Sequence, residues 1–356
     1  MSWLVLVTAS LLGMAIVANA ASLQQVANFG NNPTSLQMYV YVPANKLAKP
    51  PIIVAIHPCG GSAQEYYSLT QLPSYADQLG FVLVYPQTTH DSNCWDVHSS
   101  ASLTHNGGGD SQGIVNMVTY ALTTYNGDAT RVFSVGSSSG AMMTPVLLAA
   151  YPDVFGGGAG FSGVPAGCFA GSACSTPLCS NQTCAQGQLL YSPQQWGNLA
   201  RAEYPGYAGP RPIVQVWEGT ADTLVVIANL QDQLNQWSNV LGLEFSHNVT
   251  NNPQQGYTKI VYGDGTKLVG YSAQGQGHFV PFHEVDVLTF FGLLEPPLQE
   301  PPLPLPLPLA ARLLVQQSMV SAQECIGLVR VAAPLPIALT QTLTILNAFE
   351  VRFFIK

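Results

Sequence analysis

The sequence predicts an α/β fold, in which a mainly parallel β-sheet carries helices on both of its faces. From Gln37 to about Gly292, short apolar runs rich in β-branched residues alternate with longer segments of helical spacing. Runs such as Ile52–Ile56 are apolar without interruption, as expected for strands that are buried on both faces. In such sheets, active sites lie beyond the carboxyl ends of the strands.

The elements can be placed in order along the chain. We expect strands at residues 38–42, 52–56, 81–85, 131–135 and 213–217. Apolar residues recur at helical spacing in the segment 110–125, so a helix is expected there. Further helices are expected at residues 141–150 and 284–291.

The N-terminus has the pattern of a secretory signal peptide. Residues 3–17 are apolar and uncharged, and they end at Ala18-Asn19-Ala20, the small-x-small pattern that signal peptidase accepts. The run is too short to span a bilayer comfortably, and a buried N-terminal helix is the alternative. We therefore expect a signal peptide at residues 1–20, a mature chain that starts near Ala21, and secretion.

The composition excludes some partners. The net charge is −8 and only 8% of the residues are charged, so the chain cannot neutralise a run of phosphates and nucleic acid is excluded as a partner. A neutral surface rich in small polar residues suits a polysaccharide or a small ester. We expect a monomer that does not bind membranes.

Four of the seven cysteines lie in one Gly/Ser-rich loop. Cys168, Cys174, Cys179 and Cys184 allow three pairings, of which we favour the nested set Cys168–Cys184 and Cys174–Cys179. A zinc site made by these four residues is the alternative, and the absence of a CxxC pair disfavours it.

The other cysteines and two sequons also fit a secreted chain. Cys59 and Cys94 are left to form a disulfide, which makes Cys325 the odd cysteine. The sequons at Asn181 and Asn248 predict N-glycosylation in surface loops.

The composition changes after Leu294. We expect one α/β domain at residues 21–294 and an extended Pro-rich linker at residues 295–309, because proline interrupts helices and central strands. The tail at residues 310–356 is apolar without a clear pattern. A membrane anchor is disfavoured by its prolines, and a small accessory domain or an error in the gene model are the other interpretations.

A nucleophilic serine is predicted at Ser138. The segment 136–140 reads GSSSG, which has the form G-x-S-x-G and lies between an expected strand and an expected helix, as this motif requires. Larger side chains at the two glycines would collide with neighbouring backbone. The turn would present the Ser138 hydroxyl at the positive end of the following helix. The alternative is an ordinary turn in a chain rich in Gly and Ser.

A serine hydroxyl needs a base, and the base needs an acid to orient it. His278 is the predicted base, because it lies in a Gly- and Pro-flanked loop late in the chain, as in α/β-hydrolases. Its nearest rival is His283, which we expect to cap the last helix or to face solvent. Asp222 is the predicted acid, since it lies just beyond the strand 213–217, where an Asx-turn or helix cap is the alternative. The rival acid is Glu218, which we expect to point away from the histidine.

The reaction also needs N–H donors for an oxyanion. The backbone N–H of Ser139, which follows the nucleophile, is one candidate. The loop after the strand 52–56 supplies the other, and we choose Cys59 because Pro58 has no N–H. A Cys59–Cys94 disulfide would hold this loop, in which His57 is expected to have a structural role.

Several motifs resemble those of a known family. They are HPCGGS (57–62), NCWD (93–96), THNGGGDS (104–111), GSSSGAMM (136–143), YPDVF (151–155), GTAD (219–222) and GHFVPFH (277–283). From about Gln37 to Leu294 the chain resembles the fungal acetylxylan and feruloyl esterases of carbohydrate esterase family one, which are related to polyhydroxybutyrate-depolymerase-like esterases. The resemblance implies an α/β-hydrolase fold, a triad of Ser138, Asp222 and His278, and an esterase that needs no metal or cofactor.

Two positions depart from the family pattern. Glu218 stands where a histidine is usual in the family, which adds a carboxylate near the triad. Two alternatives are open: the carboxylate shifts the pH profile of the triad, or it turns outward. Pro58 replaces a usual glycine in the candidate oxyanion loop. The tail has one cysteine and no tryptophan, so it is not the cellulose-binding module that many relatives carry.

The expected function is removal of acetyl groups from acetylated xylan through an acyl-enzyme. The alternative is a feruloyl esterase that releases ferulate from arabinoxylan, since both activities use the same machinery. A more distant alternative is a non-catalytic carbohydrate-binding protein on a hydrolase scaffold, which the intact triad disfavours.

Overall fold

The computed structural model describes residues 21–172 and 181–295. They belong to the first of two compact units of the chain, Met1–Pro296. The predicted signal peptide, the linker from residue 296 onward, the tail and the Cys174–Cys179 pair lie outside the described residues. Within those residues, no helix is long and apolar enough to cross a membrane.

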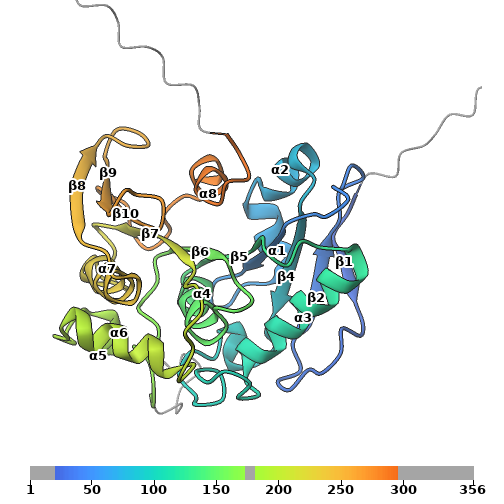
Figure 1. Cartoon of the computed structure of the whole chain (residues 1–356), viewed down its shortest axis with the longest axis horizontal. Coiled ribbons are helices and arrows are strands. Elements are labelled where there is room, and N and C mark those ends of the chain that lie inside the picture. Colours follow the sequence, from blue (N-terminus) through green and yellow to red (C-terminus); the bar gives the residue numbers. More distant parts are fainter. Residues whose placement is uncertain (1–20, 173–180, 296–356) are drawn as a thin grey trace, which may run out of the picture. The chain divides into compact units, whose positions relative to one another are not determined.

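A single mixed sheet of ten strands runs through the described part of the chain (Figure 1), in the order β1-β2-β4-β3-β5-β6-β7-β10-β9-β8. The six strands from β4 to β10 are parallel, and both edges are antiparallel. The sheet is therefore mainly parallel, as predicted. The strands are β1 (Gln24–Val26), β2 (Gln37–Tyr41), β3 (Ile52–Ile56), β4 (Val82–Gln87), β5 (Val132–Ser137), β6 (Gly157–Phe161), β7 (Ile213–Gly219), β8 (Phe245–Thr250), β9 (Tyr257–Tyr262) and β10 (Leu268–Ala273).

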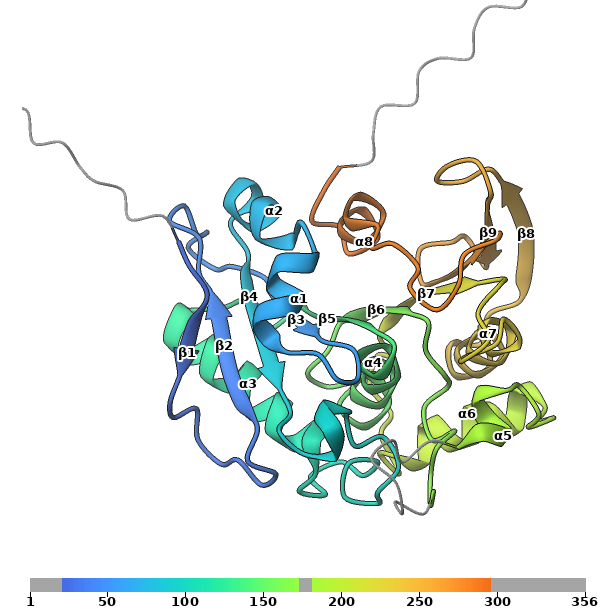
Figure 2. The same cartoon turned by 180° about the vertical axis from the view of Figure 1, so that it is seen from behind.

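Helices cover both faces of the sheet (Figures 1 and 2). One face carries α1 (Ala63–Leu69), α2 (Leu72–Leu79) and α8 (Glu284–Phe290). The other carries α3 (Asp110–Tyr125), α4 (Ser139–Ala150), α6 (Pro193–Ala202) and α7 (Ala228–Leu241). Each face has its own hydrophobic core, because the central strands direct apolar side chains alternately to both sides.

The predicted elements match the structure to different degrees. The strand at residues 52–56 and the helix at residues 110–125 have the predicted bounds, and the other predicted elements shift by one or two residues. The strands β1, β6, β8, β9 and β10 were not predicted.

The strand β6 escapes prediction because it is rich in glycine, which has low β-propensity. The structure explains its composition. A Cβ on Gly157 would lie 2.5 Å from Cγ1 of Ile213, and one on Gly158 would lie 2.7 Å from Cγ2 of Thr144. Glycine therefore allows β7 and α4 to pack closely against this central strand.

The tryptophans at 95, 196, 217 and 237 are buried, at 0–3% exposure.

Candidate active site

Ser138 lies at a sharp turn between β5 and α4. Its backbone has φ 53° and ψ −119°, a strained conformation for a residue with a side chain. A Cβ on Gly136 would lie 2.3 Å from backbone atoms of Gly140, and one on Gly140 would lie 2.2 Å from the carbonyl oxygen of Ile56. Both positions of the motif therefore need glycine, because a side chain there would collide with neighbouring backbone atoms. This close packing shapes the turn that carries Ser138.

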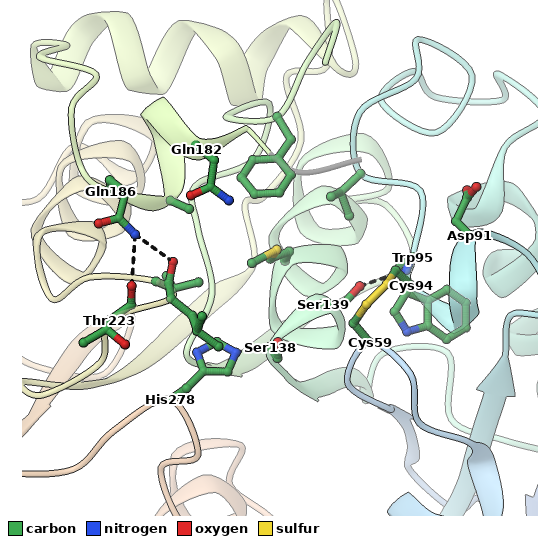
Figure 3. A pocket seen from close by; sticks show the side chains of 16 residues that line it. Cys59, Asp91, Cys94, Trp95, Ser138, Ser139, Gln182, Gln186, Thr223 and His278 are labelled. Atoms are coloured by element: carbon green, nitrogen blue, oxygen red, sulfur yellow. Dashed lines mark hydrogen bonds between the residues drawn. A yellow bond between two sulfur atoms is a disulfide. The ribbon is translucent and has the colours of Figure 1, made fainter. Parts of the chain in front are cut away.

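Three side chains form a hydrogen-bonded chain at this turn. His278 Nε2 lies 2.7 Å from Ser138 Oγ, and His278 Nδ1 lies 2.7 Å from Oδ2 of Asp222. The Asp222 side chain is fully buried and that of His278 is 11% exposed. Figure 3 shows the imidazole facing Ser138. The structure therefore brings together the three residues that the sequence predicted as a triad.

Asp222 serves two partners at once. Its Oδ2 contacts the imidazole, while its Oδ1 accepts hydrogen bonds from the backbone N–H groups of Leu224, at 2.8 Å, and Val225, at 3.0 Å. The Asx-turn considered as an alternative is therefore present alongside the contact with His278. These backbone bonds fix the orientation of the carboxylate.

Glu218 is fully buried and directed into the protein rather than outward. Its Oε1 accepts hydrogen bonds from the N–H of Gly163, at 2.8 Å, and from Nε2 of Gln233, at 3.1 Å. Burial raises the pKa of Glu218 well above its usual range, and the nearby charge of Asp222 raises it further. As predicted, Glu218 does not take the place of Asp222 beside the histidine.

The expectation for His283 is confirmed for its position at the start of α8 and is wrong for the surroundings of its side chain. It occupies the N-cap position of α8, but its side chain makes no cap hydrogen bond and is only 12% exposed. Its ring stacks on the indole of Trp217, with centroids 4.5 Å apart and an interplanar angle of 5°. The ring packs against the core because Trp217 offers it a flat aromatic surface.

The two candidate oxyanion residues lie near Ser138. Ser139 begins α4, where the first backbone N–H groups have no acceptor within the helix. Cys59 follows β3 and forms a disulfide with Cys94, as predicted. Both residues line the same cavity as Ser138 (Figure 3).

Hydrogen bonds tie the Cys59 loop to the start of α4. Trp95 donates its backbone N–H to Ser139 Oγ at 2.8 Å and its indole N–H to the carbonyl of His57 at 2.9 Å. His57 is buried, its Nδ1 lies 2.8 Å from the carbonyl oxygen of Pro58, and burial lowers its pKa. It lies within the loop as a structural residue.

A cavity of about 240 Å³ opens beside Ser138. Its apolar wall contains Met142, Phe169, Leu224 and Val225. The sequence did not single out these residues, because they come from separate segments without a common motif. Figure 3 shows the cavity, with Gln186 donating from Nε2 to the carbonyls of Thr223 and Leu224.

The disulfide Cys168–Cys184, also as predicted, joins two parts of this wall at the short helix α5 (Gln182–Ala185). Because both sulfur atoms are in the disulfide, a zinc site made by the four loop cysteines is excluded. Among the described residues, no cluster of His, Cys, Asp or Glu could hold a metal ion.

A network of charged side chains beside the cavity was also not predicted from the sequence. His90 lies between Asp91, which lines the cavity, and the buried Asp110, at 2.9 and 3.0 Å. The hydrogen bond to Asp110 is the main reason that the pKa of His90 rises to about 9. No local pattern signals this network, because it depends on a turn in which Asp91, Ser92 and Asn93 all have positive φ.

The two predicted glycosylation sites differ in their surroundings. Asn248 is exposed on the edge strand β8 rather than in a loop. Asn181 caps α5 by accepting the N–H of Cys184 at 3.1 Å, and it is partly buried. Glycosylation at both sites stays a prediction.

Comparison with known proteins adds family information. A family model described as Esterase PHB depolymerase matches residues 35–252. The chain is 56% identical to feruloyl esterase B of Neurospora crassa, over 80% of this chain and 98% of that protein. It is 45% identical to a probable acetylxylan esterase A of Neosartorya fischeri, over 77% of this chain and 74% of that protein. Its structure is similar to that of an acetyl xylan esterase from Aspergillus awamori, with a TM-score of 0.73 and 42% identity, over 77% of this chain and all of that one.

Proposed function

Because this chain belongs to the esterase PHB depolymerase family and is a carboxylic-ester hydrolase, we propose that it is a secreted serine esterase that removes acyl groups from substituted xylan. The observation that carries the proposal is the hydrogen-bonded chain Ser138–His278–Asp222 at the wall of an apolar cavity. A mainly apolar cavity wall suits an acyl group, and the adjacent imidazole suits proton transfer.

The reaction is proposed to proceed in two steps. His278 takes the proton of Ser138, whose oxygen attacks the ester carbonyl. The N–H groups of Cys59 and Ser139 stabilise the oxyanion, and His278 returns the proton to the leaving alcohol. Water then attacks the acyl-enzyme with His278 again as base, while Asp222 stabilises the charged imidazole.

The first candidate for the acyl group is acetate, which makes the protein an acetylxylan esterase. Two similar proteins support it by name, the probable acetylxylan esterase A of Neosartorya fischeri and the structurally similar acetyl xylan esterase of Aspergillus awamori.

The second candidate is ferulate, and two observations favour it. The cavity, about 240 Å³ and lined by Met142, Phe169, Leu224 and Val225, is larger than an acetyl group needs and suits an aromatic acyl chain. The feruloyl esterase B of Neurospora crassa shares more identity with this chain than the acetylxylan esterase relatives reported above.

We further propose that residues 1–20 are removed on secretion and that the protein acts as a monomer. The two disulfides in the described part of the chain support an oxidising compartment.

The test measures two products in parallel, acetate from acetylated xylan and ferulate from methyl ferulate. Wild type, Ser138→Ala and the control Ser246→Ala, at an exposed position on β8, are compared. In Ser138→Ala, turnover of both substrates is expected to fall by roughly three or more orders of magnitude. In Ser246→Ala, turnover is expected to be retained.

The ratio of the two products assigns the acyl group. Dominant acetate establishes the first candidate, and dominant ferulate establishes the second. Retained turnover in Ser138→Ala would contradict the proposed nucleophile. Lack of turnover of either substrate by folded wild type would contradict an acyl-xylan esterase.

A further inference from the structure

A second groove shares His278 with the cavity beside Ser138 that the acyl group is proposed to occupy, which we call the acyl cavity. The volume of this second groove is about 480 Å³, and His278 lines both spaces. One wall comes from the junction of α1 and α2, with Leu69 and Gln71, and the other from the loop before α8, with Phe279. Glu284 Oε1 accepts the backbone N–H of Gln71 at 2.6 Å, which joins the two walls. We call this space the alcohol-side groove.

The alcohol-side groove displays apolar side chains to solvent. Phe279 is 72% exposed and Leu69 is 70% exposed. Single exposed apolar residues are normal, but two on one groove with a polar rim are typical of a ligand-binding site. Phe282, also in the groove, stacks on Phe161 with centroids 4.6 Å apart, so its ring is held in place.

The chemistry of ester cleavage indicates what enters this groove. His278 Nε2, 2.7 Å from Ser138 Oγ, must deliver a proton to the oxygen of the departing alcohol. The alcohol part of the ester therefore lies next to His278. The acyl part is proposed to fill the acyl cavity, which contains Ser138, Ser139 and Cys59. The second space that His278 lines is then left for the alcohol.

We propose that the alcohol-side groove is the glycan subsite, in which a pyranose ring of the xylan backbone stacks its C–H face on the ring of Phe279. A pyranose has an apolar face and a rim of hydroxyl groups. The exposed ring of Phe279 and the side chain of Leu69 match the face, and Gln71 and Glu284 offer polar atoms to the rim. This inference rests on the proposed function, since it takes the alcohol to be a xylan hydroxyl.

The test uses unsubstituted xylohexaose as a competitive inhibitor of para-nitrophenyl acetate hydrolysis. Wild type, Phe279→Ala and Leu69→Ala are compared with Phe245→Ala, a matched control at an exposed phenylalanine on β8. We expect Phe279→Ala to raise the inhibition constant roughly tenfold, the size of one lost aromatic contact. Leu69→Ala should raise it less, and Phe245→Ala should leave it unchanged.

A second readout separates binding from an effect on the base. The ring of Phe279 lies 5.5 Å from that of His278, so its removal can also disturb the imidazole. The specificity constant for acylated xylan should fall about tenfold more than that for para-nitrophenyl acetate. Equal falls in the two specificity constants, with an unchanged inhibition constant, would overturn the subsite. The subsite would also be overturned if xylohexaose did not inhibit wild type.

The two proposals can fail independently. If wild type releases neither acetate nor ferulate from xylan, the proposed function fails. Inhibition by xylohexaose that weakens in Phe279→Ala would still support the glycan subsite. An inhibition constant that is the same in wild type and Phe279→Ala overturns the subsite even when xylan is deacylated.

Discussion

Asp222 illustrates how one buried side chain can both orient a base and shape a loop. Its two carboxylate oxygens have separate tasks, one at His278 and one at the backbone of Leu224 and Val225. The proposed acid is thus held by the same turn that brings Leu224 and Val225 to the cavity wall.

The substitution Asp222→Asn tests this arrangement. The amide oxygen can still accept the two backbone N–H groups, while the amide nitrogen donates to Nδ1 of His278 and moves the imidazole proton to Nε2. The imidazole then cannot accept the proton of Ser138, so we expect kcat to fall by roughly three to four orders of magnitude with little change in Tm. Steady-state kinetics and thermal unfolding check both values. A fall of less than about tenfold would contradict the proposed role of Asp222.

Glu218 differs from Asp222 although both acids are buried near the end of β7. The hydrogen-bond partners of Glu218 Oε1 are the N–H of Gly163 and Nε2 of Gln233, and neither carries a positive charge. Burial therefore raises the pKa of Glu218 well above its usual range. The folded protein then retains a proton that the unfolded chain releases above about pH 4.3. By linkage, this group lowers stability as pH rises above that value, up to its own folded pKa.

Glu218→Gln keeps an oxygen acceptor for Gly163 and does not ionise. We expect the stability of this variant relative to wild type to increase between about pH 4 and about pH 8. Urea unfolding at both values measures it, with Glu244→Gln, an exposed position, as the control for removal of one carboxylate. An unchanged difference between variant and wild type would mean that Glu218 is not protonated in the folded protein.

At the scale of elements, the turn between β5 and α4 depends on close approach of three backbone segments. Gly136 and Gly140 contact each other, and Gly140 also contacts the end of β3. The positions of the nucleophile and of the Cys59 loop after β3 are therefore coupled through backbone packing.

Gly140→Ala tests this coupling. Its Cβ would meet backbone atoms of Ile56 and His57, which cannot yield as a flexible side chain can. We expect a loss of about 3 kcal/mol or more in the free energy of unfolding, together with lost activity. Urea unfolding checks it against Gly156→Ala, where the nearest atoms are 3.6 Å away and a small effect is expected. Similar losses in both variants would show that close packing at Gly140 is not the cause.

At the scale of the whole molecule, the sheet, both cores and the candidate site all lie in the described residues 21–172 and 181–295. The match to the Neurospora crassa protein covers 98% of that relative but 80% of this chain. The first compact unit of the chain ends at Pro296, which supports the proposed boundary near residue 295.

A chain of residues 21–295 is therefore expected to keep the kcat/KM and the unfolding midpoint of the mature protein. Kinetics on para-nitrophenyl acetate and urea unfolding compare the two forms. A truncated chain that is inactive or unfolds markedly earlier would show that later residues support the catalytic domain.

The local sequence determined the mainly parallel sheet and the three residues that the structure joins at Ser138. Apolar runs mark buried strands, and the motif around Ser138 needs only a turn between a strand and a helix. Each apolar run and the Ser138 motif lie within a few consecutive residues, whereas Asp222 and His278 were predicted from their loops and their order in the chain. The glycine-rich β6 and the stacking of His283 on Trp217 escaped prediction, because they depend on partners far away in the chain.

Only the tertiary structure decided the shape of the site. The cavity brings Trp95, Phe169 and Leu224 together, and the alcohol-side groove pairs Leu69 with Phe279. The burial of Glu218 was decided in the same way, by contacts with Gly163 and Gln233. A catalytic motif is recognisable in sequence because its geometry is local, whereas a binding surface forms only where distant loops meet at the edge of the sheet.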